Sequence, residues 1–357
     1  MRADIAQLVL PNHIKFKGKS FGYPKSIAGE VVFNTGMTGY VESLTDPSYR
    51  GQILVFSYPL IGNYGVPESK VVKGIPKYFE SSRIQVAGVI VSDYSHDYRH
   101  WQAVRSLGAW LQQEKIPALS GIDTRHLTTI LREEGSVLGK IQFPGDKIHF
   151  DDPNKRNLVS EVSITQPRVY KGGKQKIVVV DCGVKFNIIR SLLGRGFTVK
   201  HVPWDYDYSQ DAFAGIVFSN GPGDPAMCPD TVNLLSQQYK KSKPILGICL
   251  GSQIMARAAG AKTYKLKFGH RSHNQPCLVK NTKRCYITSQ NHGYAVRSST
   301  LPRHWQVWMT NANDGTIEAI KHKSKPFWGV QFHPEATPGP VDTNFIFDEW
   351  VKLVKRQ

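Results

Sequence analysis

The pattern of apolar positions differs between the part of the chain before about residue 143 and the part after about residue 176. In the first part, apolar runs at 29–33 and 51–56 are broken by turns rich in glycine, proline and asparagine, which is typical of a β-rich α+β domain. In the second part, continuous apolar runs at 177–180, 197–199 and 216–218 alternate with helix-like segments such as 188–194. This alternation predicts a parallel sheet buried on both faces, with its functional site at the carboxyl ends of the strands.

Two helices are predicted in the first part. Trp101, Val104, Leu107, Trp110 and Leu111 recur at helical spacing, so we expect a helix over 101–113 whose aromatic side chains pack in the core. A second helix is expected near 124–133.

A polar stretch between these two parts of the chain marks a domain boundary. The chain has 357 residues, more than one hydrophobic core usually serves. The pattern therefore predicts a first domain at 1–143, a linker at 144–175 and a second domain at 176–357.

Composition narrows the class of protein. The formal net charge is +18, but lysine and arginine are scattered and accompany no nucleic-acid motif, so we expect a basic surface or attraction to an acidic partner protein rather than nucleic acid. No apolar stretch is long enough to span a membrane. Five cysteines without paired spacing favour a reducing compartment, so we expect the cytoplasm, or the mitochondrial matrix if a transit peptide was removed.

One cysteine stands where a nucleophile is expected. Residues 243–248 resemble a buried strand and 256–259 a helix, and Cys249 falls at the turn between them. Gly247 and Gly251 would allow a sharp turn, placing the sulfur at a helix N-terminus whose dipole favours thiolate. The other cysteines are expected to be structural: Cys182, Cys228, Cys277 and Cys285.

A nucleophilic cysteine needs a base, and the base needs an orienting group. His333 and Glu335 follow the predicted strand 327–332, and residues two apart in an extended chain face the same way. Backbone N–H groups for an oxyanion are expected at Leu250 and in the glycine-bearing turn 220–225.

These motifs resemble those of class I (triad) glutamine amidotransferases: Asn-Gly-Pro-Gly-Asp-Pro at 220–225, Gly-Ile-Cys-Leu-Gly-Ser-Gln at 247–253 and Gln-Phe-His-Pro-Glu at 331–335. The segments 29–40, 44–49, 59–65, 289–295 and 334–340 resemble the glutaminase subunit or domain of carbamoyl phosphate synthetase. The resemblance implies an α/β protein in which a small swivelling β/β/α-type domain precedes a flavodoxin-like glutaminase domain.

The resemblance also implies roles for individual residues. Cys249 would attack the carboxamide carbon of L-glutamine, His333 would shuttle the proton and Glu335 would orient His333, while Leu250 and Gly221 would line the oxyanion hole. The positions matching glutamine-binding residues of the family are Ser48, Gly221, Gly223, Leu250, Gln253, Asn291, Gly293 and Tyr294. Ser48, from the first domain, would help to close the site. Ser252 and Ser272 depart from the family's commonest residues, histidine and glycine, and could change the basal rate.

The implied partner is the large, ammonia-using synthetase subunit or domain, which would serve arginine, pyrimidine or urea synthesis and hold ATP and Mg²⁺. We expect no cofactor in this chain, because no phosphate-binding Gly-x-x-x-x-Gly-Lys-Ser/Thr motif is present. We also expect no metal, since His270 and His273 lack further ligands at recognisable spacing.

Two other functions fit parts of the pattern. Residues 91–95 and 152–155 resemble ammonia-dependent urea-cycle synthetases, whose glutaminase-like domain can be inactive and regulatory. The presence of Cys249, His333 and Glu335 favours an active enzyme. An α/β-hydrolase with a cysteine nucleophile would share the Gly-x-Cys-x-Gly turn, but in that family the acid precedes the histidine.

Overall fold

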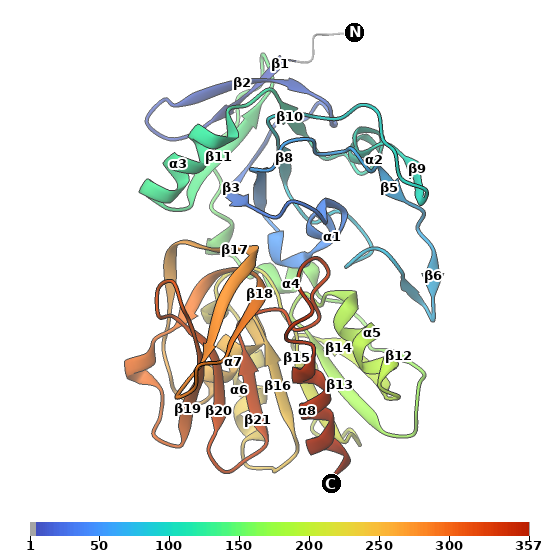
Figure 1. The fold of residues 1–357 in the computed structure, drawn as a ribbon, viewed down its shortest axis with the longest axis vertical. Coiled ribbons are helices and arrows are strands. Elements are labelled where there is room, and N and C mark those ends of the chain that lie inside the picture. Colours follow the sequence, from blue (N-terminus) through green and yellow to red (C-terminus); the bar gives the residue numbers. More distant parts are fainter. Residues whose placement is uncertain (1–4, 357) are drawn as a thin grey trace. The chain divides into compact units, whose positions relative to one another are not determined.

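A computed structural model describes residues 5–356, which form two compact units (Figure 1). The first unit runs to Val72 and from Pro76 to Lys155, and the second comprises Lys73–Ile75 and the chain from Arg156 onward. The division therefore falls inside the segment expected to be a linker.

The second half of that expected linker is folded into the second unit. It contains helix α4 (Leu158–Val162) and strand β12 (Arg168–Tyr170), which pairs with β14 (Thr198–Pro203). Because β12 is an edge strand with exposed Arg168 and Val169, its sequence lacks the apolar run by which buried strands are recognised.

The first unit is built on a closed barrel with the strand order β1-β11-β3-β4-β8-β10-β2. Its strands are β1 (Ile5–Val9), β2 (Lys15–Ser20), β3 (Ile27–Asn34), β4 (Gln52–Phe56), β8 (Gly88–Ile90), β10 (Ala118–Ser120) and β11 (Val137–Gln142). Side chains such as Leu8, Ile53 and Ile141 form one buried cluster, and Leu44, Leu54 and Trp110 belong to another. Closure leaves no free edge among these seven strands.

Helices and short strands complete the first unit. They are α1 (Tyr40–Thr45), the 3₁₀ turns Pro47–Tyr49 and Pro153–Lys155, α2 (Leu107–Gln113), α3 (Thr124–Glu134), and the pair β5 (Val66–Pro67) with β9 (Ala103–Arg105). The short strands β6 (Val71–Val72) and β7 (Ile75–Pro76) lie where the chain leaves the first unit after Val72 and returns to it at Pro76. The helix expected near 124–133 is α3, confirmed within one residue.

The helix expected over 101–113 is only half present. Helix α2 begins at Leu107, because the Ser106 side chain accepts a hydrogen bond from the Ala109 backbone N–H and caps the helix there. Val104 lies in β9, and Trp101 is 86% exposed rather than in the core. Their helical spacing to Leu107 was coincidental.

The second unit is centred on a parallel sheet. Strands β14, β13 (Lys176–Asp181), β15 (Gly215–Phe218), β16 (Ile245–Ile248) and β21 (Phe327–Val330) lie side by side in that order and run parallel. Numbered along the chain, this order is 2-1-3-4-5, the flavodoxin-like arrangement. The carboxyl ends of β15, β16 and β21 are therefore neighbours.

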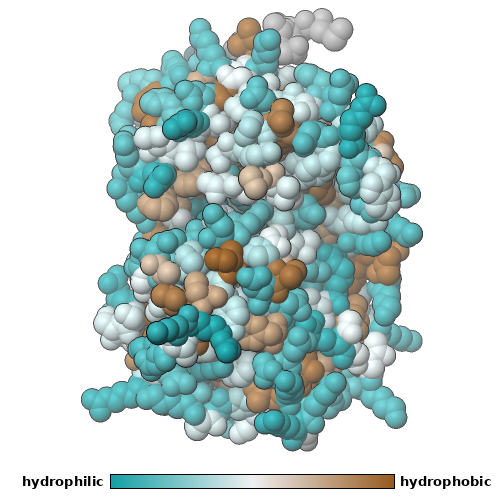
Figure 2. Space-filling view, in the orientation of Figure 1, coloured by the Kyte–Doolittle hydropathy of each residue, from teal (hydrophilic) through white to brown (hydrophobic). Residues whose placement is uncertain are grey.

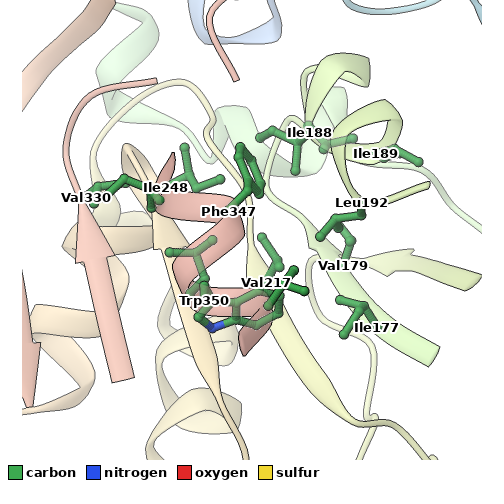
Figure 3. Close-up of a cluster of buried hydrophobic side chains, with 14 of the residues drawn as sticks. Ile177, Val179, Ile188, Ile189, Leu192, Val217, Ile248, Val330, Phe347 and Trp350 are labelled. Carbon is green, nitrogen blue, oxygen red and sulfur yellow. The ribbon is translucent and has the colours of Figure 1, made fainter. Parts of the chain in front are cut away.

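Helices cover both faces of this sheet. Helices α5 (Phe186–Gly194) and α8 (Phe345–Lys355) pack on one face, where Ile188, Leu192, Phe347 and Trp350 meet the strand residue Val217 (Figure 3). Residues of α6 (Pro229–Gln238) and α7 (Leu250–Ala258) contribute to the cluster on the other face. Burial on both faces explains the continuous apolar runs in the sequence.

Four antiparallel strands extend the sheet beyond β21. They are β20 (Ile317–His322), β19 (Trp305–Asn311), β17 (Thr263–Val279) and β18 (Cys285–Val296), with 3₁₀ turns at Pro225–Met227 and Ser298–Thr300 elsewhere in the unit. The long strand β18 carries three of the residues matched to glutamine binding, Asn291, Gly293 and Tyr294.

The face shown in Figure 2 is mostly hydrophilic, with hydrophobic residues scattered among the polar ones. Among residues 5–356, no helix has both the length and the apolar character that crossing a bilayer requires.

Candidate active site

Cys249 lies at the sharp turn between β16 and α7, as expected. It has φ 52° and ψ −108°, a backbone conformation that is costly for a residue with a side chain and is typical of nucleophiles held at a strand-to-helix turn. A hydrogen bond of 2.8 Å from its backbone N–H to the Val330 carbonyl ties the turn to β21. Since Cys249 directly precedes the first residue of α7, its side chain is at the helix N-terminus.

The glycines on either side are required by close packing. A Cβ at Gly251 would lie 2.1 Å from the Phe218 carbonyl oxygen, and one at Gly247 would lie 2.6 Å from the Gly251 carbonyl oxygen. Neither distance is compatible with a side chain, so both positions need glycine for the turn to form.

His333 and Glu335 lie side by side, as their spacing predicted. Nδ1 of His333 is 2.6 Å from Oε1 of Glu335, and both residues are buried. Nε2 of His333 is buried and forms no hydrogen bond to a described residue. Because Nδ1 is held by the carboxylate, Nε2 is the nitrogen left to exchange a proton with the nucleophile or the substrate.

Sequence reasoning missed the residue that neutralises Glu335. Lys185 precedes α5, and its Nζ is 3.0 Å from Oε1 of Glu335 and 2.5 Å from the Ala336 carbonyl oxygen. Asn187 also donates a hydrogen bond to the Glu335 carbonyl. Both follow β13, so the rule that functional residues gather at carboxyl strand ends was the signal that could have found them.

Burial and charge shift the pKa values of this group in opposite directions. Burial alone would lower the pKa of His333, but the Glu335 carboxylate outweighs it and raises that pKa, with a further contribution from nearby Cys249. Burial would raise the pKa of Glu335, but Lys185 and His333 together lower it. The arrangement therefore favours an imidazolium next to a carboxylate, with the cysteine close enough to help raise the pKa of the histidine.

The two turns expected to supply oxyanion donors are adjacent. A Cβ at Gly221 would lie 1.8 Å from the Cys182 carbonyl oxygen and 2.8 Å from Cδ2 of Leu250, so position 221 requires glycine and contacts the first residue of α7. In the same turn, Gly223 has φ 80°, which favours glycine. The Lys185 backbone N–H donates to Oδ1 of Asn220, linking this turn to the segment that neutralises Glu335.

Among the residues matched to glutamine binding, Asn291 contacts the sulfur, and Gln253 of α7 is hydrogen-bonded to Tyr294. Sγ of Cys249 lies 3.7 Å from the Asn291 carbonyl oxygen, and Nε2 of Gln253 donates to the Tyr294 carbonyl oxygen at 2.8 Å. Gly293 lies between the two carbonyls on β18. Antiparallel strand β18 therefore brings its residues beside the turn that holds Cys249.

Ser48 lies in the first unit, in the 3₁₀ turn Pro47–Tyr49, where its backbone N–H donates to Oδ1 of Asp46. The two departures from the family pattern lie in the second unit. Ser252 is buried in α7, and its Cβ is 3.0 Å from where a side chain on Gly329 would begin. Ser272 accepts a hydrogen bond from Nε2 of Gln275.

The remaining cysteines differ from Cys249. Cys182, Cys228 and Cys277 are buried, and burial raises the pKa of each thiol. A raised pKa leaves little thiolate at neutral pH, which makes these thiols weak nucleophiles. Cys285 is exposed.

A second histidine cluster lies on β17, β18 and β20. Side-chain atoms of His270, His292 and Glu318 that could bind a metal lie within 4.8 Å of one another. The Gln290 side chain joins all three: its Oε1 is 3.0 Å from Nδ1 of His270 and 2.9 Å from Nε2 of His292, and its Nε2 donates to Glu318 at 2.8 Å. The potential ligands are therefore engaged in a hydrogen-bond network, and His273 is not part of it.

Comparison with protein families agrees with the division into two units. Residues 178–353 match the family described as glutamine amidotransferase class-I, and residues 8–141 match the carbamoyl-phosphate synthase small chain, CPSase domain. The chain belongs to the carbamoyl phosphate synthetase small-chain family. The resemblance read from the sequence motifs is thereby confirmed.

Individual relatives of this chain are several times longer than the chain itself. It is 49% identical to human mitochondrial carbamoyl-phosphate synthase [ammonia], matching 100% of this chain and 24% of the relative. It is 51% identical to the multifunctional protein CAD of Squalus acanthias, matching 98% of this chain and 16% of that protein. It is 47% identical to the multifunctional protein URA2 of Saccharomyces cerevisiae, matching 98% and 18%. The chain thus spans about a quarter or less of the length of these relatives.

Proposed function

We propose that this chain hydrolyses L-glutamine through a thioester on Cys249 and supplies the released ammonia to a carbamoyl phosphate synthetase. The observation that carries the proposal is the strained turn at Cys249 beside the buried group formed by His333, Glu335 and Lys185.

The first half of the reaction releases ammonia. The Cys249 sulfur attacks the carboxamide carbon, a C–S bond forms, and the carbonyl electrons move to the oxygen. Backbone N–H groups of Leu250 and Gly221 stabilise this oxyanion. The C–N bond then breaks as His333 gives its proton to the nitrogen, so ammonia leaves and a thioester remains.

The second half restores the enzyme. His333, now neutral, takes a proton from water, whose oxygen attacks the thioester carbon. The C–S bond breaks, glutamate leaves, and the sulfur returns as thiolate beside the protonated histidine. Glu335 holds the imidazole in the orientation that both halves require.

The proposed reaction needs a partner protein that consumes the released ammonia. Free ammonia is protonated in neutral water and loses its nucleophilicity, so we propose that the chain docks on a synthetase that consumes bicarbonate and ATP. ATP and Mg²⁺ would bind to that partner and not to this chain. We propose a cytoplasmic location, although some relatives are named mitochondrial.

The competing function is a regulatory domain without activity, favoured by the relatives named carbamoyl-phosphate synthase [ammonia]. One assay separates the two: glutamate release from glutamine, measured for the chain with and without the synthetase. We expect turnover that the synthetase stimulates, complete loss in Cys249→Ala, and no change in Cys285→Ala, which removes an exposed thiol. Absence of turnover in the unmodified protein together with its synthetase would favour the regulatory function.

A further inference from the structure

Gln331, the residue directly after β21, contacts the nucleophile. Its Nε2 lies 3.6 Å from Sγ of Cys249, within the range of N–H···S hydrogen bonds. The side chain is buried, and its backbone N–H donates to the Glu318 carbonyl oxygen at 2.7 Å. A fixed backbone and a buried side chain leave the carboxamide few alternative positions.

A second glutamine decides which end of that carboxamide faces the sulfur. Nε2 of Gln253 donates both to the Tyr294 carbonyl oxygen at 2.8 Å and to Oε1 of Gln331 at 3.0 Å. The Tyr294 carbonyl can only accept, so it fixes the NH₂ group of Gln253 on this side. Oε1 of Gln331 must then turn toward Gln253, and the NH₂ group of Gln331 toward Cys249.

The two contacts of the sulfur respond differently to its ionisation. The Asn291 carbonyl oxygen, 3.7 Å from Sγ, accepts a hydrogen bond from the thiol and loses it when the proton leaves. The Gln331 N–H group can donate to the thiol and donates more strongly to the thiolate, because hydrogen bonds to charged acceptors are the stronger ones. Of these two contacts, therefore, only the one with Gln331 favours the reactive form.

We propose that Gln331 is a further catalytic residue, whose side-chain N–H stabilises the Cys249 thiolate and holds the sulfur for attack, and that Gln253 is the residue that orients it. For glutamine hydrolysis this rests on the proposed function; for the reactivity of the sulfur it does not. The thiolate is both the attacking group in the first step and the leaving group in the last, so one hydrogen bond assists both.

The direct test is alkylation of Cys249 by iodoacetamide across a range of pH, followed by mass spectrometry of the Cys249 peptide. Gln331→Met keeps a side chain of similar length but has no N–H group. Loss of a hydrogen bond to a charged group should move the midpoint of the alkylation profile to higher pH by about one unit, which is about a tenfold loss of rate below the midpoint. Gln331→Leu should act in the same direction.

Gln275→Leu is the matched control. It removes a carboxamide that bonds Ser272 and Asn311 and not the nucleophile. Its alkylation profile should match the unmodified protein, and circular dichroism should show that each variant is folded. An unchanged profile in folded Gln331→Met, or an equal shift in Gln275→Leu, would overturn the proposal.

The orienting role of Gln253 has its own readout. Gln253→Leu should shift the alkylation profile in the same direction as Gln331→Met, and the double variant should shift it no further than Gln331→Met alone. Additive shifts would contradict the orienting role.

Glutamine kinetics then separate this proposal from the function on which it rests. In an active enzyme, Gln331→Met should lower kcat about tenfold with little change in KM. If the unmodified protein has no glutaminase activity but the alkylation profile shifts, the function fails and the contact with the sulfur stands. If activity is present and the profile is unchanged, the function stands and the role of Gln331 fails.

Discussion

Two of the buried histidine–carboxylate groups in the second unit differ in how many of their ring nitrogens form hydrogen bonds. Around His270, both ring nitrogens are engaged, Nδ1 with Gln290 and Nε2 with Asp314 at 2.9 Å. His333 has one nitrogen held by Glu335 and the other without a hydrogen bond to a described residue. A histidine with hydrogen bonds at both ring nitrogens, such as His270, is suited to a structural role. His333 lies beside a strained cysteine and has one ring nitrogen without such a bond, so it can transfer a proton.

The electrostatic support of the two groups differs as well. Lys185 is buried and lies beside Glu335, so the Glu335 carboxylate is stabilised by a neighbouring cation rather than by water. Asp314, in contrast, is 40% exposed at its side chain and draws on solvent. The group around His333 is therefore the more sensitive of the two to loss of a single partner.

The largest difference should appear on removing one charge from each group. Glu335→Gln leaves the shape but not the carboxylate that orients His333, and we expect glutamine hydrolysis to fall by about 10²–10⁴-fold. Asp314→Asn, the equivalent change at His270, should alter kcat far less. Steady-state kinetics of the two variants compare them directly, and equal losses would remove the distinction.

Lys185→Met should affect stability as well as activity. It removes one of the two cations beside the buried Glu335 carboxylate and leaves His333 to compensate the charge, which should cost about 3–5 kcal/mol in the free energy of unfolding. With its lowered pKa, Glu335 stabilises the fold above about pH 4.5 and loses this contribution as the pH falls toward its folded value. Without Lys185 that pKa rises, so the loss should begin at higher pH.

Urea unfolding at several pH values measures both effects. Lys352→Met provides a control, since Lys352 forms an exposed ion pair with Glu349 and its loss should change stability by less than about 1 kcal/mol. A Lys185→Met protein as stable as this control would show that Lys185 does not compensate a buried charge.

The smallest effect is expected at His270. Burial lowers its pKa, but Glu318 and Asp314 outweigh burial and raise it. The stabilisation is therefore present below about pH 6.5 and is lost as the pH rises through the folded pKa. His270→Gln should remove this contribution to the pH dependence of stability. Urea midpoints between pH 6 and pH 9 would show it as a fall in stability with rising pH that is steeper in the unmodified protein than in the variant.

Local patterns in the sequence were sufficient to predict the geometry of the candidate site around Cys249. The turn at Cys249 follows from a glycine on each side of it, one in the strand and one in the helix, and the pairing of His333 with Glu335 follows from a spacing of two in an extended segment. Each depends on residues close together in the chain, so elementary backbone geometry predicts it.

Contacts between residues far apart in the sequence could not be predicted in this way. Lys185 and Glu335 are separated by 150 residues, and only the order of the parallel strands brings them together. The side-chain contact between Gln331 and Cys249 has the same origin. The false extension of α2 toward Trp101 shows the opposite failure, in which a periodic pattern continues past the residue that caps the helix.

The central claim, a covalent glutamyl thioester on Cys249, can be observed by incubating the protein and its synthetase with radiolabelled glutamine, quenching in acid and mapping the label by peptide mass spectrometry. We expect label on the peptide that contains Cys249, released by mild base as expected for a thioester, and none in Cys249→Ala. Glutamine turnover without label in the unmodified protein, or label that persists in Cys249→Ala, would contradict it.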